Sequence, residues 1–406
     1  MSGPVKWFTF EDFGAPELNN QQGDLINVLD ACLITGLGVQ TIHSITIENG
    51  VAVATFNSAH RLNQFQVVEL SGASSNILNA EFKILGLTFN TIEFLVDLPD
   101  QVIAENISCR LAPLGWSKLF NGNQKAVYQA KNSERNPYFF RIDDNRDTAY
   151  SASYAKFAKV GILESCNDID DLTGVQAPFD PGNPNKNWTS TGSGSTVISG
   201  WFKWYYAVAN NAATSTGIYE SYGVTSGARE WLLVGDDDTF YILPNFTVGG
   251  NGYSLYGFGV VENPNIGNFL PFLSASNRNF SAGTALSITS ALGSLSDLAM
   301  IKNDSNAYQN TVFGSVKLPF GIASAGSYNT FKHGNGYDFL FGPFYMIDNE
   351  NSFVGEFPIL LCSLYQNANI ADRVPIIDNG RALMKLTFRP DRNLTGRLWF
   401  DLGGVN

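Results

Sequence analysis

The feature that most constrains the fold of this chain is a pair of apolar, β-prone runs joined by a short acidic turn. Residues 231–242 read WLLVGDDDTFYI. Two apolar runs on either side of a glycine-led acidic tip predict a β-hairpin. Short segments with the same alternation or apolar character recur along the chain, and we therefore predict a mainly β protein.

Near the N-terminus, apolar residues recur at helical spacing and predict a short helix over residues 24–35. Its apolar stripe consists of Leu25, Val28, Leu29 and Leu33, together with Cys32. A helix of this length is marginal in water on its own, so the stripe must dock on a partner. The chain's own core and a neighbouring subunit are the two alternatives. We predict that residues 1–37 form a helical anchor whose stripe is buried in an assembly.

From residue 40 the hydrophobic period switches to two. Short strands are predicted at residues 41–47, 51–56, 65–70, 82–87, 91–96 and 107–111. Asn49-Gly50, between the first two strands, is a strong signal for a tight hairpin turn. Strands this short and closely spaced predict a small antiparallel β-barrel over residues 38–113.

Residues 114–406 are predicted to form a larger β-sandwich of the jelly-roll type. Besides the hairpin, strands are predicted at residues 138–144, 339–346, 357–364, 383–388 and 398–402. The segments 155–163 and 286–292 carry a helical pattern instead.

A loop-rich stretch, residues 178–199, leads into an aromatic cluster at residues 201–206. We expect the stretch to be exposed. The cluster is best explained as the aromatic core of a β-sandwich, because aromatic side chains bury a large area. The alternative is surface binding of carbohydrate, for which the candidate residues are Trp188, Trp201, Trp204 and Tyr205.

We predict no catalytic residue, no metal ligand and no cofactor. The three histidines have no metal-ligand spacing, and the four cysteines form no CxxC pair. Acidic residues lie close in sequence at 143–144, 168–171 and 236–238. Those at the hairpin tip are interpreted as solvated turn formers, because aspartate suits turns through its own hydrogen bonds.

Charge and hydropathy argue against two classes of partner, nucleic acids and membranes. The net charge is −12 and no long basic run occurs, which disfavours nucleic-acid binding. No apolar run of about 20 residues predicts a membrane span, and no signal peptide is visible at the start of the sequence. Only 15% of residues are charged whereas 13% are aromatic, a composition that favours association with other subunits.

Three segments resemble, in order, a family of structural proteins of tailed-bacteriophage virions. They are the hairpin at 231–242, the stretches GEFPIL, GRALMKL and GRLWFD within 355–401, and GAPEL followed by GDLINVLDACL within 14–33. The resemblance implies a non-enzymatic virion component of the tail or head–tail region, present in symmetric copies. Its partners would be other virion proteins and copies of itself, assembled in the host bacterial cytoplasm.

Residues 38–113 also resemble the β-fold of the first catalytic cysteine half-domain of ubiquitin-activating enzymes. We reject the enzymatic implication, because no nucleotide-binding glycine loop accompanies it and Cys109 falls on a predicted strand with no histidine nearby. One alternative function is a receptor- or carbohydrate-binding appendage of the tail-fibre or spike type, recognising a host surface glycan. A weaker one is a glycan-depolymerising enzyme, which needs two facing carboxylates in a cleft.

Overall fold

The computed structural model describes residues 3–209, 217–250, 252–263, 267–277, 285–287, 298–299, 315–317, 341–347, 353–363, 370–388 and 396–405. It is mainly β, with 48% strand and 6% helix in curled antiparallel sheets, which confirms the predicted fold class. No helix in the described part of the chain is long and apolar enough to cross a bilayer.

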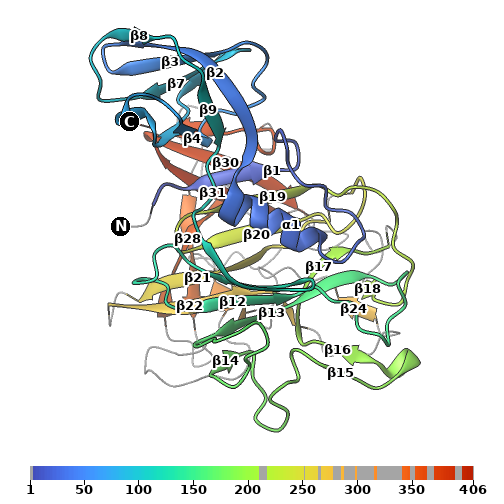
Figure 1. The fold of residues 1–406 in the computed structure, drawn as a ribbon. Helices are drawn as coiled ribbons and strands as arrows, with labels where there is room; N and C mark the ends of the chain where they lie inside the picture. Colours follow the sequence, from blue (N-terminus) through green and yellow to red (C-terminus); the bar gives the residue numbers. More distant parts are fainter. Residues whose placement is uncertain are drawn as a thin grey trace, which may run out of the picture.

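The small module, residues 37–111, is an eight-stranded curled sheet that forms the upper lobe in Figure 1. Its strands are β2 (Leu37–Glu48), β3 (Val51–Phe56), β4 (Val67–Ser71), β5 (Glu81–Lys83), β6 (Gly86–Leu87), β7 (Thr91–Leu95), β8 (Gln101–Ile103) and β9 (Ile107–Leu111), with a 3-10 turn η2 (Asn76–Leu78). Five of the six predicted strands are confirmed here. The sixth, predicted at residues 82–87, is divided into β5, which pairs with β4, and β6, which pairs with β7, and β8 is an additional strand. Asn49 and Gly50 both have positive φ, 51° and 78°, as a tight hairpin turn between β2 and β3 requires.

The predicted helix is present as α1 (Asp24–Asp30) followed by a π-helical turn η1 (Ala31–Thr35). It begins at residue 24, as expected, with Gly23 as the N-cap residue. Its apolar stripe packs inside the chain's own core: Leu25, Val28, Leu29 and Leu33 are each 0% exposed. The anchor prediction for these four residues is therefore wrong, because no part of the stripe is left for a neighbouring subunit to cover.

The rest of the chain, called the body here, contains three large antiparallel sheets. The hairpin sheet holds β1 (Lys6–Thr9), β19 (Trp231–Gly235), β20 (Phe240–Pro244), β21 (Tyr256–Asn263), β22 (Asn268–Ser274) and β25 (Leu298–Ala299). The aromatic sheet holds β10 (Ser117–Gly122), β11 (Lys125–Gln129), β12 (Phe139–Asp143), β13 (Lys156–Leu163), β17 (Phe202–Ala207) and β23 (Ser276–Asn277), with β14 (Gln176–Ala177) beside β13. The C-terminal sheet holds β26 (Ser315–Lys317), β27 (Phe341–Ile347), β28 (Phe353–Ser363), β31 (Gly396–Gly404), β30 (Arg381–Phe388) and β29 (Ile376–Asp378).

Two small strand pairs complete the described elements: β15 (Ser190–Thr191) with β16 (Ile198–Ser199), and β18 (Gly217–Tyr219) with β24 (Ala285–Ser287); a 3-10 turn η3 (Gly194–Thr196) lies between β15 and β16. The helical pattern at 155–163 was misleading, since residues 156–163 are strand β13. Of the segment 286–292, residues 286–287 are described, as part of β24, and the remainder lies outside the described residues.

The hairpin sheet is the middle layer of the body. On one face, Trp231 and Phe240 share a core with Phe140 and Trp204 of the aromatic sheet. On the other face, alternate residues of the hairpin pack against the C-terminal sheet. Residues 231–235 are buried on both faces, which explains why they form a continuous apolar run instead of an alternating one.

Candidate functional site

The outer face of the aromatic sheet, which points away from the shared core, carries a row of charged residues. The strand register pairs Lys125 with Asp143, Asp143 with Lys159, and Lys159 with Lys203. Directly paired residues project to the same face of a sheet, so these four side chains lie side by side. Asp143, Lys159 and Lys203 are buried despite their charges. Lys159 Nζ donates to the Trp188 carbonyl in the segment after β13, and Lys203 Nζ pairs with Glu220.

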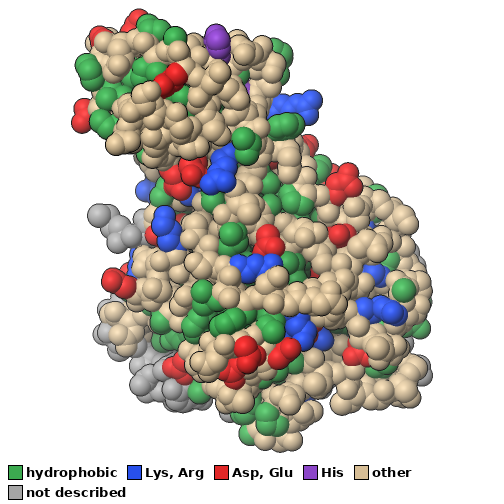
Figure 2. All heavy atoms as spheres, in the orientation of Figure 1, with side chains coloured by type: hydrophobic (Ala, Val, Ile, Leu, Met, Phe, Trp, Pro, Cys, Tyr) green, Lys and Arg blue, Asp and Glu red, His purple; other side chains and the backbone are tan. Residues whose placement is uncertain are grey.

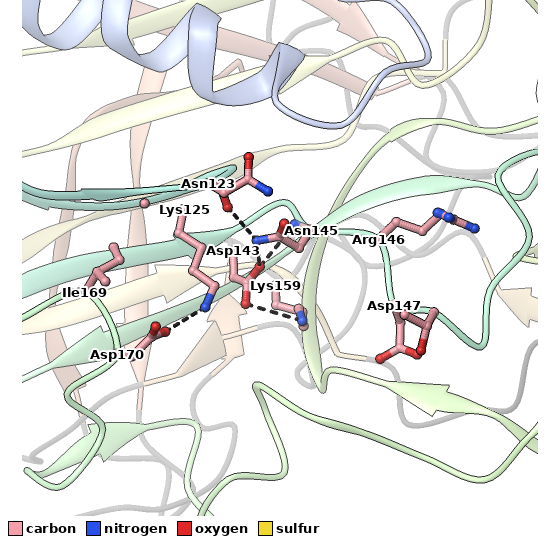
Figure 3. A pocket seen from close by; sticks show the side chains of 11 residues that line it. Asn123, Lys125, Asp143, Asn145, Arg146, Asp147, Lys159, Ile169 and Asp170 are labelled. Atoms are coloured by element: carbon pink, nitrogen blue, oxygen red, sulfur yellow. Dashed lines mark hydrogen bonds and ion pairs between the residues drawn. The ribbon is translucent and has the colours of Figure 1, made fainter.

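At the open end of this row lies a polar hollow of about 530 Å³ (Figure 3). Its lining residues are Gly122, Asn123, Lys125, Asp143, Asn145, Arg146, Asp147, Thr148, Lys159, Ile169 and Asp170. The floor is the ion pair between Lys159 Nζ and Asp143 Oδ2, which are 3.4 Å apart. Both charged side chains are almost fully buried, so the floor is a fixed dipole between two neighbouring strands.

One wall of the hollow comes from the loop that follows β13. Asp170 Oδ1 accepts hydrogen bonds from Lys125 Nζ at 2.7 Å and from Arg141 Nη2 at 2.9 Å. These cationic partners lower the pKa of the Asp170 carboxyl below its usual value, chiefly through the hydrogen bond from Lys125. The loop is thereby tied to the sheet, and Ile169 is held against Gly122 as an apolar wall.

Asp143 and Asp144 are adjacent in sequence, yet they serve opposite faces of the aromatic sheet. Asp144 accepts hydrogen bonds from the Gly23 N–H at 2.6 Å and from the Tyr206 hydroxyl at 2.8 Å. It therefore fastens the start of α1, and burial raises its pKa well above the usual value. The carboxylates of the pair do not face one another, as two acids flanking a glycosidic bond would.

The aromatic residues nominated for surface binding are mostly internal. Trp188, Trp204 and Tyr205 are 6%, 0% and 1% exposed. Trp204 stacks between two rings of the shared core, Phe140 at 4.8 Å and Tyr256 at 5.5 Å. The surface-binding prediction is wrong for these three residues, because their rings are packed inside the protein.

Trp188 and Trp201 show how the loop-rich stretch folds. The ring of Trp188 packs over the Arg141 guanidinium at 4.3 Å and so tightly against Gly161 that a Cβ there would lie 2.5 Å from it. This part of the loop is a cover for the sheet, contrary to the expectation that the whole stretch is exposed. Trp201 is half-buried, and Lys186 Nζ lies 4.4 Å from its ring centroid.

The acidic hairpin tip is a turn, as expected, but it is not solvated. Asp236 and Asp238 are 3% and 1% exposed. The Trp116 indole donates a hydrogen bond to the Asp236 carbonyl, and the Asn136 side chain donates one to the Asp238 carbonyl. Burial, with the charge of Asp238 beside it, raises the pKa of the Asp236 carboxyl.

The side-chain oxygens of these three aspartates lie within 4.8 Å of one another, a spacing that oxygen ligands around a divalent cation adopt. Arg135 Nε already lies 3.0 Å from Asp238 Oδ2, and the Asp236 carboxylate caps the turn by accepting from the Asp238 and Thr239 N–H groups. Arg135 thus offsets part of the negative charge of the tip, and the geometry of the tip serves the turn itself.

The described cysteine side chains are thiols in apolar or partly covered surroundings. Cys109 lies on β9, as predicted, and burial raises its pKa to about 12. Burial also raises the pKa of Cys32 well above its usual value. A thiol held in its protonated form is a poor nucleophile. Cys166 is half-buried, and the side chain of Cys362 lies outside the described residues.

Comparison of the chain with known protein families and with curated proteins found no match.

Proposed function

We propose that this chain is a non-enzymatic structural component of a tailed-phage virion, associated with the tail or head–tail region, that works through contacts between subunits. The observation that carries the proposal is the surface of the small module. Large hydrophobic side chains exposed on it are Val39 (66%), Ile77 (50%), Leu87 (41%), Phe89 (76%), Leu95 (51%) and Val102 (68%). Figure 2 shows hydrophobic side chains at the surface of this upper lobe.

Part of this surface crosses four neighbouring strands, with Thr46 as its polar member on β2. The register pairs Val102 of β8 with Thr46, Thr46 with Val53 of β3, and Val51 with Leu95 of β7. Alternation along β3 and β7 places Ala52 and Phe94 inside, so their neighbours Val51, Val53 and Leu95 face outward. We call Val51, Val53, Leu95 and Val102 the apolar strip.

An apolar strip of this kind suits burial against another protein. Contiguous exposed apolar surface marks protein–protein contacts in soluble proteins. The small module also projects from the body in Figure 1, which leaves it accessible to a neighbour. The adjacent acids Asp143 and Asp144 support the same proposal, because Asp143 pairs with Lys159 and Asp144 accepts a hydrogen bond at the start of α1.

The test is to place a charge on the strip. Val102→Asp and Leu95→Asp should prevent incorporation of the subunit into particles, because a carboxylate buried in an apolar contact costs several kcal/mol. Gln101→Asp, on the same strand as Val102 and also exposed to solvent, is the matched control and should incorporate normally. Incorporation is measured as copy number in purified particles, and folding of each variant by its melting temperature.

The proposal also specifies what a reconstruction of the particle should contain. We expect the apolar strip to lie in an interface that buries more than ~1,000 Å² in total, as stable protein contacts do. Normal copy number of the Val102→Asp and Leu95→Asp variants, or a reconstruction in which the strip faces solvent, would contradict the proposal.

A further inference from the structure

We propose that the polar hollow on the outer face of the aromatic sheet is a binding site for a neutral saccharide. This inference goes beyond the structural role proposed above and is independent of it, because the hollow lies on the body and the apolar strip lies on the small module. It also differs from the aromatic surface site that the sequence offered as an alternative, where the rings of Trp188, Trp204 and Tyr205 are buried.

The charge balance of the lining selects the class of ligand. The lining contains three cationic residues, Lys125, Arg146 and Lys159, and three carboxylates, Asp143, Asp147 and Asp170. A phosphate would require an excess of positive charge, and a polyamine or metal ion would require an excess of negative charge. Sugar hydroxyls donate and accept hydrogen bonds at once, and they therefore match a lining that offers both donors and acceptors in equal measure.

The polar groups of the hollow are fixed before any ligand arrives. Asp143 Oδ1 accepts hydrogen bonds from both the backbone N–H and the side-chain amide of Asn145, each at 3.0 Å. The same amide donates to the Asn123 carbonyl at 2.7 Å, and Lys159 Nζ donates to the Trp188 carbonyl at 3.1 Å. Figure 3 shows the contacts of Asn145 with Asn123 and Asp143, and the ion pair of Asp143 with Lys159. Preorganised groups lose little entropy on binding, which favours a weakly interacting ligand such as a sugar.

The hollow also offers an apolar surface beside the polar one. Ile169 stands against the backbone of Gly122 at one side, where its side chain can contact the C–H face of a sugar ring. Arg146 and Asp147 lie on the opposite side in Figure 3. The volume of about 530 Å³ lies within the usual range of small-molecule sites. A sugar ring can therefore be held edge-on by polar groups and face-on by one aliphatic side chain.

The experiment uses the full chain with a panel of methyl glycosides and oligosaccharides released from bacterial surface polysaccharides as probes. Binding is measured by saturation-transfer NMR and calorimetry. We expect at least one saccharide to bind, and Asn123→Ala and Ile169→Arg to weaken that binding by at least about tenfold. Asn123 is an exposed rim residue, so its truncation spares the fold. Asn121→Ala, an exposed asparagine two residues away and outside the hollow, is the matched control and should bind normally.

Three outcomes would overturn the inference. They are the absence of binding by every saccharide in the panel, equal loss in the Asn121→Ala control, and binding of inorganic phosphate in place of saccharide. The apolar-strip variant Val102→Asp should retain saccharide binding, and Asn123→Ala should retain incorporation into particles. Failure of one proposal is therefore distinguishable from failure of the other.

Discussion

At the scale of single residues, the buried carboxylates hold segments of backbone in place. Asp12 is an example: it accepts hydrogen bonds from the Thr9 N–H at 2.7 Å and from the Gln66 side chain at 3.0 Å, and so connects the N-terminal strand to the small module. It is 5% exposed, and burial raises its pKa from 3.8 to about 6. The hydrogen bonds oppose this rise without cancelling it.

The raised pKa of Asp12 predicts a pH dependence of stability. Between about pH 3.8 and pH 6 the folded state keeps a proton that the unfolded state has lost, so the contribution of Asp12 is full below pH 3.8 and is lost as the pH rises to about 6. Within that window the free energy of unfolding should fall by up to about 1.4 kcal/mol per pH unit on account of this group. Denaturant unfolding of the wild type and of Asp12→Asn at several pH values measures the difference in slope. Parallel curves for the two proteins would refute the assignment.

Single residues also show where burial could be predicted from the sequence and where it could not. Trp204 was correctly interpreted as core, because a large ring in a β-rich chain has more to gain from burial than from solvent. Trp188 and Asp238 were not recognised as buried, because each is covered by residues distant in sequence. Trp188 packs against Gly161, and the Asn136 side chain donates a hydrogen bond to the Asp238 carbonyl. Local patterns carry no information about such contacts.

At the scale of elements, hydrophobic periodicity predicted the strands of the small module well, because one face of each strand is buried and the other faces solvent, as on β3. It failed on β13, which is buried along its whole length although Lys156 and Lys159 lie within it. A charged residue in a sequence is expected to face solvent, whereas the charged residues on the outer face of the aromatic sheet are largely covered. The lining of the hollow went unrecognised for the same reason.

The docking of α1 leads to a prediction about the isolated protein. Leu29→Asp should destabilise the free subunit by several kcal/mol, because it places a carboxylate at a position that is 0% exposed within the chain's own core. Asn27→Asp is the matched control: Asn27 is exposed on the same helix, and an acid in the first turn is favoured by the helix dipole. Chemical denaturation of the purified variants measures both. A Leu29→Asp subunit as stable as the control, but absent from particles, would restore the anchor interpretation.

At the scale of the whole molecule, the small module is joined to the body at several points. Lys6 near the N-terminus donates hydrogen bonds to Glu81 at 2.7 Å and to the Pro113 carbonyl, while Lys83 donates to the Leu402 carbonyl at 2.6 Å near the C-terminus. One hydrophobic core also runs from the module through α1 to the body. Both ends of the chain therefore contact the module, which the sequence-based division at residues 37 and 113 did not anticipate.

This connectivity predicts that module and body unfold together. Phe94→Ala removes a fully buried ring from the small module and should cost about 3–5 kcal/mol. Because the core is shared, the loss should lower the melting temperature of the body as well, as followed by the near-ultraviolet circular dichroism of Trp204 and its neighbours. Phe89→Ala, the same substitution at a 76% exposed position of the module, should change neither transition. If the tryptophan signal of the body melts at an unchanged temperature in Phe94→Ala, the module is an independent folding unit and the shared core does not couple the two.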